Sequence, residues 1–110
     1  MQSMFKNIKS NALLRLKELI DYQPGQIVSK TLVQNDSVSI TLFAFDKGEE
    51  ISTHVSSGDA MASVLDGKGR FTVGENVFII SEGETLIMPK GVPHAVLGEE
   101  KFKMQLTVSF

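Results

Sequence analysis

The sequence predicts an all-β fold, a sandwich or barrel of antiparallel strands, and three observations support this prediction. Short runs rich in Val, Ile, Thr and Phe recur along the chain, separated by clusters of Gly, Asn and Asp. Several runs alternate apolar and polar residues with the period of two that a half-buried strand requires. The chain has no internal repeat and no low-complexity tract. Many short strands in series with turns between them are typical of one all-β domain.

Length and composition narrow the class of protein. The 110 residues fit one domain of ~100–200 residues, and we expect a β-barrel over 26–110 behind an N-terminal segment, 1–25. A net charge of −2 without a cluster of Lys and Arg argues against a nucleic-acid partner. The absence of cysteine excludes disulfides and thiolate metal sites. With no signal-peptide or membrane-spanning run either, we expect a soluble cytoplasmic protein without a membrane partner.

The residue pattern of the N-terminal segment predicts an arm followed by one short helix. Residues 1–11 are mostly polar, so they form either a mobile lead-in or an arm that docks on a partner subunit. Leu13, Leu16, Leu19 and Ile20 follow a near-helical spacing. The residues Tyr-Gln-Pro-Gly at 22–25 end this pattern, and we therefore expect a short helix or helical turn before the first strand.

The strand pattern begins after Pro24. Residues 38–45 are apolar on both faces near their end, which predicts a second layer, either the N-terminal segment or another subunit, over Phe43 and Phe45. Turns are expected at 35–36, 46–48, 66–69, 74–76 and 98–101. The predicted strand segments are 27–33, 38–45, 63–65, 70–73, 77–80, 85–88, 95–97 and 102–110.

Residues 81–98 carry two turns, a short buried strand and one histidine. Gly83 begins a turn, and Pro89 ends the apolar run that follows it. Gly91 tolerates positive φ and Pro93 fixes φ, so this bend delivers His94 at the start of the next strand. The spacing of Gly83, Pro89, Gly91 and His94 resembles the second conserved motif of the cupin superfamily, although Gly98 stands where the usual final Asn would be.

A first cupin motif is present upstream. Gly48 is followed after five residues by His54, and Gly67 closes the motif. Residues 54–67 look like the small single-domain cupins of the cupin 2 conserved-barrel type, a branch with few characterised members. The resemblance implies a double-stranded β-helix, or jelly roll, with one central cavity.

The resemblance also implies a reduced metal site. Metal-binding cupins typically offer three histidines and one glutamate; here His54 matches the first ligand and His94 the last. The position of the middle histidine is Ser56, and that of the glutamate is Ala60. Two neutral imidazoles hold a divalent cation weakly. We therefore expect either a weakly held Mn, Fe, Ni or Zn ion on His54 and His94 or no metal.

In the first motif, His54 and Ala60 belong to the set of alternate residues expected to face the inside of the barrel. We therefore expect a ligand cavity that contains both imidazoles and has extra space at Ala60, where a glutamate carboxylate would otherwise lie. A carboxylate-bearing ligand would then replace the missing glutamate, on a metal or directly between the imidazoles. It is equally open that the two histidines only bond each other, Ser56 or water. Asp59 has the opposite parity, so we expect it in solvent or in an edge hydrogen bond. The predicted ligand-binding residues are His54, Ser56, Ala60, Ala62, His94 and Met104.

Two function classes follow from these residues. The first is a cupin barrel that binds a small molecule; the second is a divalent-metal-dependent cupin enzyme of the oxygenase or isomerase type that uses His54 and His94. Whether the protein is an enzyme stays open at this point. We also expect a homodimer, from the common pairing of cupins through sheet faces or edges and from four apolar residues expected to face outward. These residues are Phe43, Phe45, Met61 and Leu65.

Overall fold

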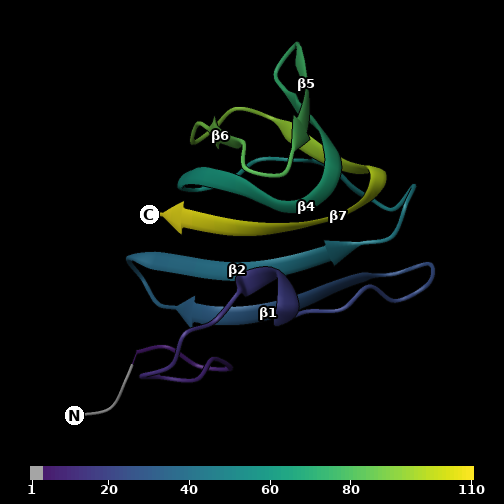
Figure 1. Ribbon diagram of the computed structural model, residues 1–110. Coiled ribbons are helices and arrows are strands. Elements are labelled where there is room, and N and C mark those ends of the chain that lie inside the picture. Colours follow the sequence, from purple (N-terminus) through teal and green to yellow (C-terminus); the bar gives the residue numbers. More distant parts are fainter. Residues whose placement is uncertain (1–3) are drawn as a thin grey trace.

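Strands dominate the fold in the computed structural model, which describes residues 4–110 (Figure 1). One 3-10 turn precedes them, where the sequence predicts a short helical segment. The all-β class and the cupin-type jelly roll are therefore confirmed. The elements are η1 (Leu16–Glu18), β1 (Ile27–Gln34), β2 (Val38–Phe45), β3 (Glu50–His54), β4 (Asp59–Val73), β5 (Asn76–Ser81), β6 (Thr85–Met88) and β7 (His94–Ser109).

All strand pairs are antiparallel. The main path runs β1-β2-β7-β4-β5, while β3 pairs with β7 and β6 pairs with β4. In Figure 1, β1 lies at the bottom of this stack and β5 projects at the top. No helix among residues 4–110 is long and apolar enough to span a membrane.

The two longest strands pass through positions where the sequence predicts turns. β4 continues through residues 66–69, and β7 continues through residues 98–101. The register between these strands shifts at Val64/Asp66 and again at Gly67/Gly69, so the glycines mark bulges instead of chain reversals. Gly67 has a φ of 72°, and a Cβ there would collide with the carbonyl oxygen of Lys101. Glycine is required at this position because the two strands approach so closely.

Two apolar clusters fill the fold on opposite sides of β2. The inner cluster occupies the barrel, where the Phe45 and Phe102 rings stack with their centroids 4.6 Å apart. The outer cluster, Ile20, Leu32, Leu42 and Ala44, lies under the N-terminal segment. The members of the inner cluster are Phe45, Ala60, Ala62, Val64, Phe71, Val73, Ile80, Met88, Val96, Phe102, Met104 and Val108.

The clusters correct the predicted orientation of β2. A second layer does cover this strand, but it covers Leu42 and Ala44. Phe45 is 0% exposed and belongs to the inner cluster, against which Phe43 also packs. The orientation was wrong because β2 is apolar on both faces, so its alternation does not distinguish inside from outside. Phe45 is therefore buried within its own chain, and the half-buried Phe43 lies next to it, with the two ring centroids 6.1 Å apart.

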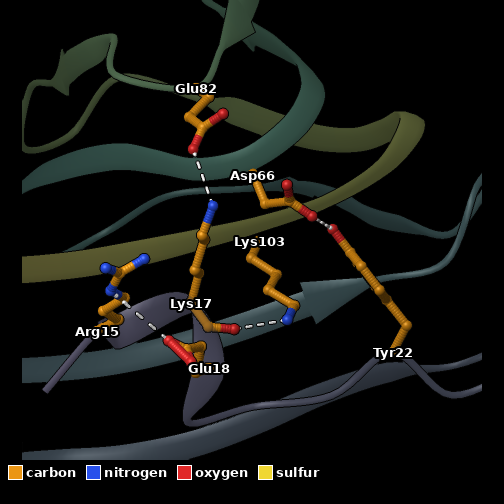
Figure 2. Close-up of polar contacts among 7 residues, drawn as sticks. All are labelled: Arg15, Lys17, Glu18, Tyr22, Asp66, Glu82 and Lys103. Atoms are coloured by element: carbon orange, nitrogen blue, oxygen red, sulfur yellow. Dashed lines mark hydrogen bonds and ion pairs between the residues drawn. The ribbon is translucent and has the colours of Figure 1, made fainter.

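Side chains of the barrel hold the segment around η1 in place (Figure 2). Lys103 Nζ donates a hydrogen bond to the Lys17 carbonyl at 2.6 Å, and Lys30 Nζ donates to the Leu19 carbonyl at 2.7 Å. The Tyr22 hydroxyl donates to Asp66 Oδ2 at 2.6 Å. Burial, and then this carboxylate, raise the pKa of Tyr22 well above its ordinary value. The two lysines satisfy carbonyl groups that a helical turn leaves free at its end.

Farther toward the N-terminus, the arm binds its own barrel. The Lys6 amide donates to the Leu32 carbonyl at 2.8 Å, and Asn7 Nδ2 donates to the Thr31 carbonyl at 2.8 Å. Both acceptors belong to β1, so the arm is attached within the chain and is neither a free lead-in nor wholly available to a partner. Residues 1–3 of the predicted arm lie outside the described residues.

Candidate functional site

The two histidines of the chain meet across a strand pair. His54 ends β3 and His94 begins β7, and the two residues are direct partners in the antiparallel register. Their ring centroids lie 4.2 Å apart with an interplanar angle of 66°. His94 is 4% exposed, whereas His54 is an exposed residue. The site therefore has one buried imidazole and one imidazole open to solvent.

Hydrogen bonds determine the tautomer of both neutral imidazole rings. His54 Nδ1 lies 2.9 Å from the Ser52 carbonyl oxygen, and His94 Nδ1 lies 3.0 Å from the Val92 carbonyl oxygen. A carbonyl oxygen only accepts, so each Nδ1 carries the proton and donates it. In the neutral rings both Nε2 atoms then offer lone pairs. Metal-binding histidines commonly have this arrangement, because the outer hydrogen bond sets the tautomer and the orientation of the ring.

The loop before His94 is bonded to the loop after His54. Asp59 Oδ1 accepts from the Lys90 amide at 2.8 Å, and the Ser56 carbonyl accepts from the Gly91 amide at 3.2 Å. Asp59 thus makes the edge hydrogen bond expected from its parity. Gly91 has a φ of 79°, and a Cβ there would meet no atom within 4 Å. Glycine is therefore favoured at this position by the positive φ of the bend, and not by a lack of space for a side chain.

The other predicted ligand-binding residues occupy two environments. Ser56 is half-buried in the loop after β3, and its hydroxyl oxygen accepts from the Gly58 amide at 3.2 Å. Ala60, Ala62 and Met104 are members of the inner cluster. The structure therefore brings the two histidines into contact, and it places the three apolar residues in the core of the same barrel.

A cleft of about 460 Å³ is lined by Val73, the register partner of His94, and by Val92 in the loop before His94. Its apolar walls come from β4, β5, β6 and the loop before His94, and its rim carries Glu75 and Asn76. Neither histidine is among its lining residues, so the cleft neighbours His94 through Val73 and Val92 and does not enclose the imidazoles. The apolar lining consists of Val73, Phe78, Leu86, Ile87, Pro89 and Val92.

The sheet register connects this cleft to the imidazoles. Asn76 on β5 pairs with Val73 on β4, Val73 pairs with His94, and His94 pairs with His54. Direct partners on antiparallel strands project from the same face of a sheet, at ~4.8 Å per strand. The four side chains therefore form one row, with the cleft at one end and the imidazoles at the other. We call this the cross-strand row.

The donor set of the site fits at most a weakly held cation. No group of three or more His, Asp, Glu or Cys side chains that could hold a metal ion occurs among residues 4–110. His54 and His94 present two nitrogen ligands, and the residues at the other two family positions, Ser56 and Ala60, add no charge. Divalent transition metals prefer more ligands and an anionic oxygen.

Sequence reasoning missed the cleft because its residues come from four elements. Val92 stands between Gly91 and Pro93 in the second motif, which was its only local signal. Phe78 and Leu86 read as ordinary strand residues. Their common position depends on the way β4 curves to pair with both β5 and β6, which only the structure specifies.

Comparisons with known proteins agree with this fold. The family model for the cupin domain matches residues 41–110. A conserved protein of unknown function from Streptococcus pyogenes is 39% identical, over 98% of this chain and 95% of its own, with a TM-score of 0.96. A cupin superfamily protein from Desulfitobacterium hafniense is 30% identical, over 98% and 99%, with a TM-score of 0.93.

A further solved structure matches in part. The cupin 2 conserved barrel domain protein from Leptotrichia buccalis is 42% identical over 88% of this chain, with a TM-score of 0.86, and the match covers 47% of that protein. No curated protein matches the chain.

Proposed function

The chain belongs to the cupin superfamily, and we propose that it binds a small molecule at the histidine pair and the adjoining cleft. The observation that carries this proposal is the cross-strand row, which joins apolar walls to two imidazoles on one face of the sheet. Ligand sites are usually apolar clefts with a few fixed polar groups, and this arrangement has both parts.

The chemistry of the imidazoles limits the polar group of the ligand. Because both Nδ1 atoms donate to carbonyls, the neutral rings offer two acceptors at Nε2 and no donor. A carboxylate cannot bind two acceptors directly, so it needs either a divalent cation between the groups or the charged form of the rings. His54 and His94 would hold such a cation, whose positive charge would bind the carboxylate that replaces the missing glutamate.

The rest of the ligand would lie in the cleft. Val73 on β4 lies between His94 on β7 and the rim residue Asn76 on β5. The imidazole and the rim are therefore two strand spacings apart, a span of ~10 Å. Phe78, Leu86 and Val92 provide apolar contact along this span. We therefore propose a ligand with a carboxylate at one end and a compact apolar body.

The experiment that tests the proposal uses benzoate as the probe. Calorimetric titrations with benzoate, in the presence and absence of Zn²⁺, would compare the parent protein with His54→Ala and with Thr53→Ala, an exposed neighbour on β3. We expect binding by the parent and by Thr53→Ala that strengthens with Zn²⁺, and loss of the Zn²⁺ effect in His54→Ala. Equal binding by all three proteins would contradict a role of the histidine.

A second candidate is a metal-dependent cupin enzyme that uses His54 and His94. The observation that favours it is the pair of Nδ1-to-carbonyl hydrogen bonds, which prepare both Nε2 atoms for a metal. An enzyme of this kind needs nearly one metal per chain, whereas a binding protein does not. Elemental analysis of protein purified without added metal decides between them. The cytoplasmic location expected from the absence of cysteine remains part of the proposal for either function.

A further inference from the structure

The rim of the cleft carries one charged residue, Glu75, with the amide of Asn76 beside it. Both side chains are exposed. Neither side chain makes a hydrogen bond or an ion pair with another of the residues 4–110. Apart from one glycine, the rest of the lining is apolar. The cleft therefore presents a free carboxylate at the edge of an apolar surface.

Backbone contacts fix the position of this carboxylate relative to the buried histidine. Glu75 lies in the two-residue turn between β4 and β5, because the residues that flank the turn, Val73 and Asn76, are register partners. The Gly74 amide donates to the Pro93 carbonyl at 2.8 Å. Pro93 directly precedes the buried histidine in the chain. The turn that carries Glu75 is thus bonded to the segment that carries the imidazole.

The two ends of the cross-strand row consequently carry different polar groups. At the imidazole end, both neutral rings offer only acceptors, and the proposed function places the carboxylate of the ligand there with a divalent cation. At the other end lies the carboxylate of Glu75. Two strand spacings, ~10 Å, separate these ends. The row therefore suits a molecule whose two ends differ in charge.

We propose that Glu75 binds a positively charged group at the far end of the ligand. A carboxylate only accepts hydrogen bonds and an ammonium only donates them, so the two groups are complementary. Hydrogen bonds between charged groups are also stronger than those between neutral groups. The amide oxygen of Asn76 can accept a second N–H of the same ammonium.

The ligand class follows from both ends together. It is an amino acid in which a compact apolar body, such as an aromatic ring, separates the ammonium from the carboxylate. This class rests on the proposed function, which supplies the carboxylate end. The role of Glu75 itself rests on the cleft, on the turn and on the free carboxylate. The two parts can therefore be tested separately.

Three probes of similar shape separate the two ends of the ligand. 4-Methylbenzoate carries only the carboxylate, 4-methylbenzylamine carries only the ammonium, and 4-(aminomethyl)benzoate carries both. Titrations at neutral pH with Zn²⁺, followed by ¹H–¹⁵N spectra, would compare the parent protein with Glu75→Gln and Glu100→Gln. Glu100→Gln is the matched control, because Glu100 is exposed, has no side-chain partner among the described residues and does not line the cleft. The same spectra show whether each variant keeps the fold.

The ammonium should strengthen binding only where Glu75 is present. We expect the parent and Glu100→Gln to bind 4-(aminomethyl)benzoate roughly 5- to 10-fold more tightly than 4-methylbenzoate, as for one exposed charged pair. Glu75→Gln should lose this difference while it binds 4-methylbenzoate as the parent does. Glu75→Lys should reverse the preference and favour terephthalate, which carries a second carboxylate at the far end.

The outcomes distinguish this inference from the proposed function. Equal affinity of the parent and Glu75→Gln for both ammonium probes would overturn the inference, even if 4-methylbenzoate binds through His54. Binding of 4-methylbenzoate that is unchanged in His54→Ala would instead contradict the proposed function. An affinity for 4-methylbenzylamine that depends on Glu75 would in that case still support the cation site at the rim. A parent protein that binds none of the three probes would overturn both.

Discussion

His54 and His94 are direct register partners on β3 and β7, and yet one imidazole is exposed and the other is 4% exposed. The difference arises because His54 ends its strand, whereas His94 begins a strand whose first residues lie between β3 and β4. The same residue type therefore has two physical roles within one site. The buried ring contributes more to packing, and the exposed ring is the side from which a ligand can reach the pair.

The two histidines should accordingly differ in their effect on stability. We expect His94→Ala to lower the free energy of unfolding by about 2 kcal/mol, because it leaves a cavity and removes a hydrogen bond to the Val92 carbonyl. We expect His54→Ala to change it by no more than about 0.5 kcal/mol, as is usual for exposed positions. Urea unfolding of both variants measures the difference. Equal losses would show that the ring-to-ring contact, and not burial, determines stability here.

The bend at Gly91 should affect the site more than the fold. Gly91→Val places a β-branched residue at a φ of 79°, which costs about 1–3 kcal/mol. Gly25→Val is a matched control, because Gly25 has a φ of 69° and, like Gly91, no atom within 4 Å of the added Cβ. Similar stability losses are expected for both variants, with about tenfold weaker Zn²⁺ binding only for Gly91→Val. Unfolding of Gly91→Val alone would contradict this prediction.

The missing ligands can be restored. Ser56→His together with Ala60→Glu should raise the affinity for Mn²⁺ by roughly 100-fold or more, since a carboxylate and a third imidazole complete the set. Ala60 is 2% exposed, so without metal the buried carboxylate should lower the thermal stability. Ser56→His with Ala62→Glu is the control, with a carboxylate in the same cluster but outside the family position. Calorimetry would refute the prediction if the parent already binds Mn²⁺ as tightly.

Alkaline pH should loosen the N-terminal segment through Tyr22. Burial and the Asp66 carboxylate raise the pKa of Tyr22 in the folded protein, so the folded state keeps this proton longer than the unfolded state. The resulting stability is complete below the ordinary tyrosine pKa of about 10 and is lost as the pH rises above it. Tyr22→Phe has no phenol to titrate, so its stability should not show this part of the decrease at alkaline pH. Parallel urea titrations from neutral to strongly alkaline pH would disprove the effect if the two proteins lost equal stability.

The sequence predicted the features that follow from spacing. Two half-motifs predicted that His54 and His94 meet, and alternation predicted most strands. The orientation of Phe43 and Phe45 could not be predicted, because a strand with two apolar faces carries no signal for inside and outside. The continuity of β4 through Gly67 was also hidden, since glycine at a bulge looks the same in a sequence as glycine in a turn. The cleft depends on contacts between distant strands, which local patterns do not specify.

His54 and His94 are proposed to present two unprotonated Nε2 atoms to a ligand. Long-range ¹H–¹⁵N correlation spectra of the histidine rings at mildly alkaline pH measure this most directly. We predict that both neutral rings carry the proton on Nδ1, and that Zn²⁺ with benzoate shifts the Nε2 signals of both residues together. A proton on Nε2 of either ring, or Nε2 signals that do not respond to Zn²⁺ and benzoate, would contradict the account.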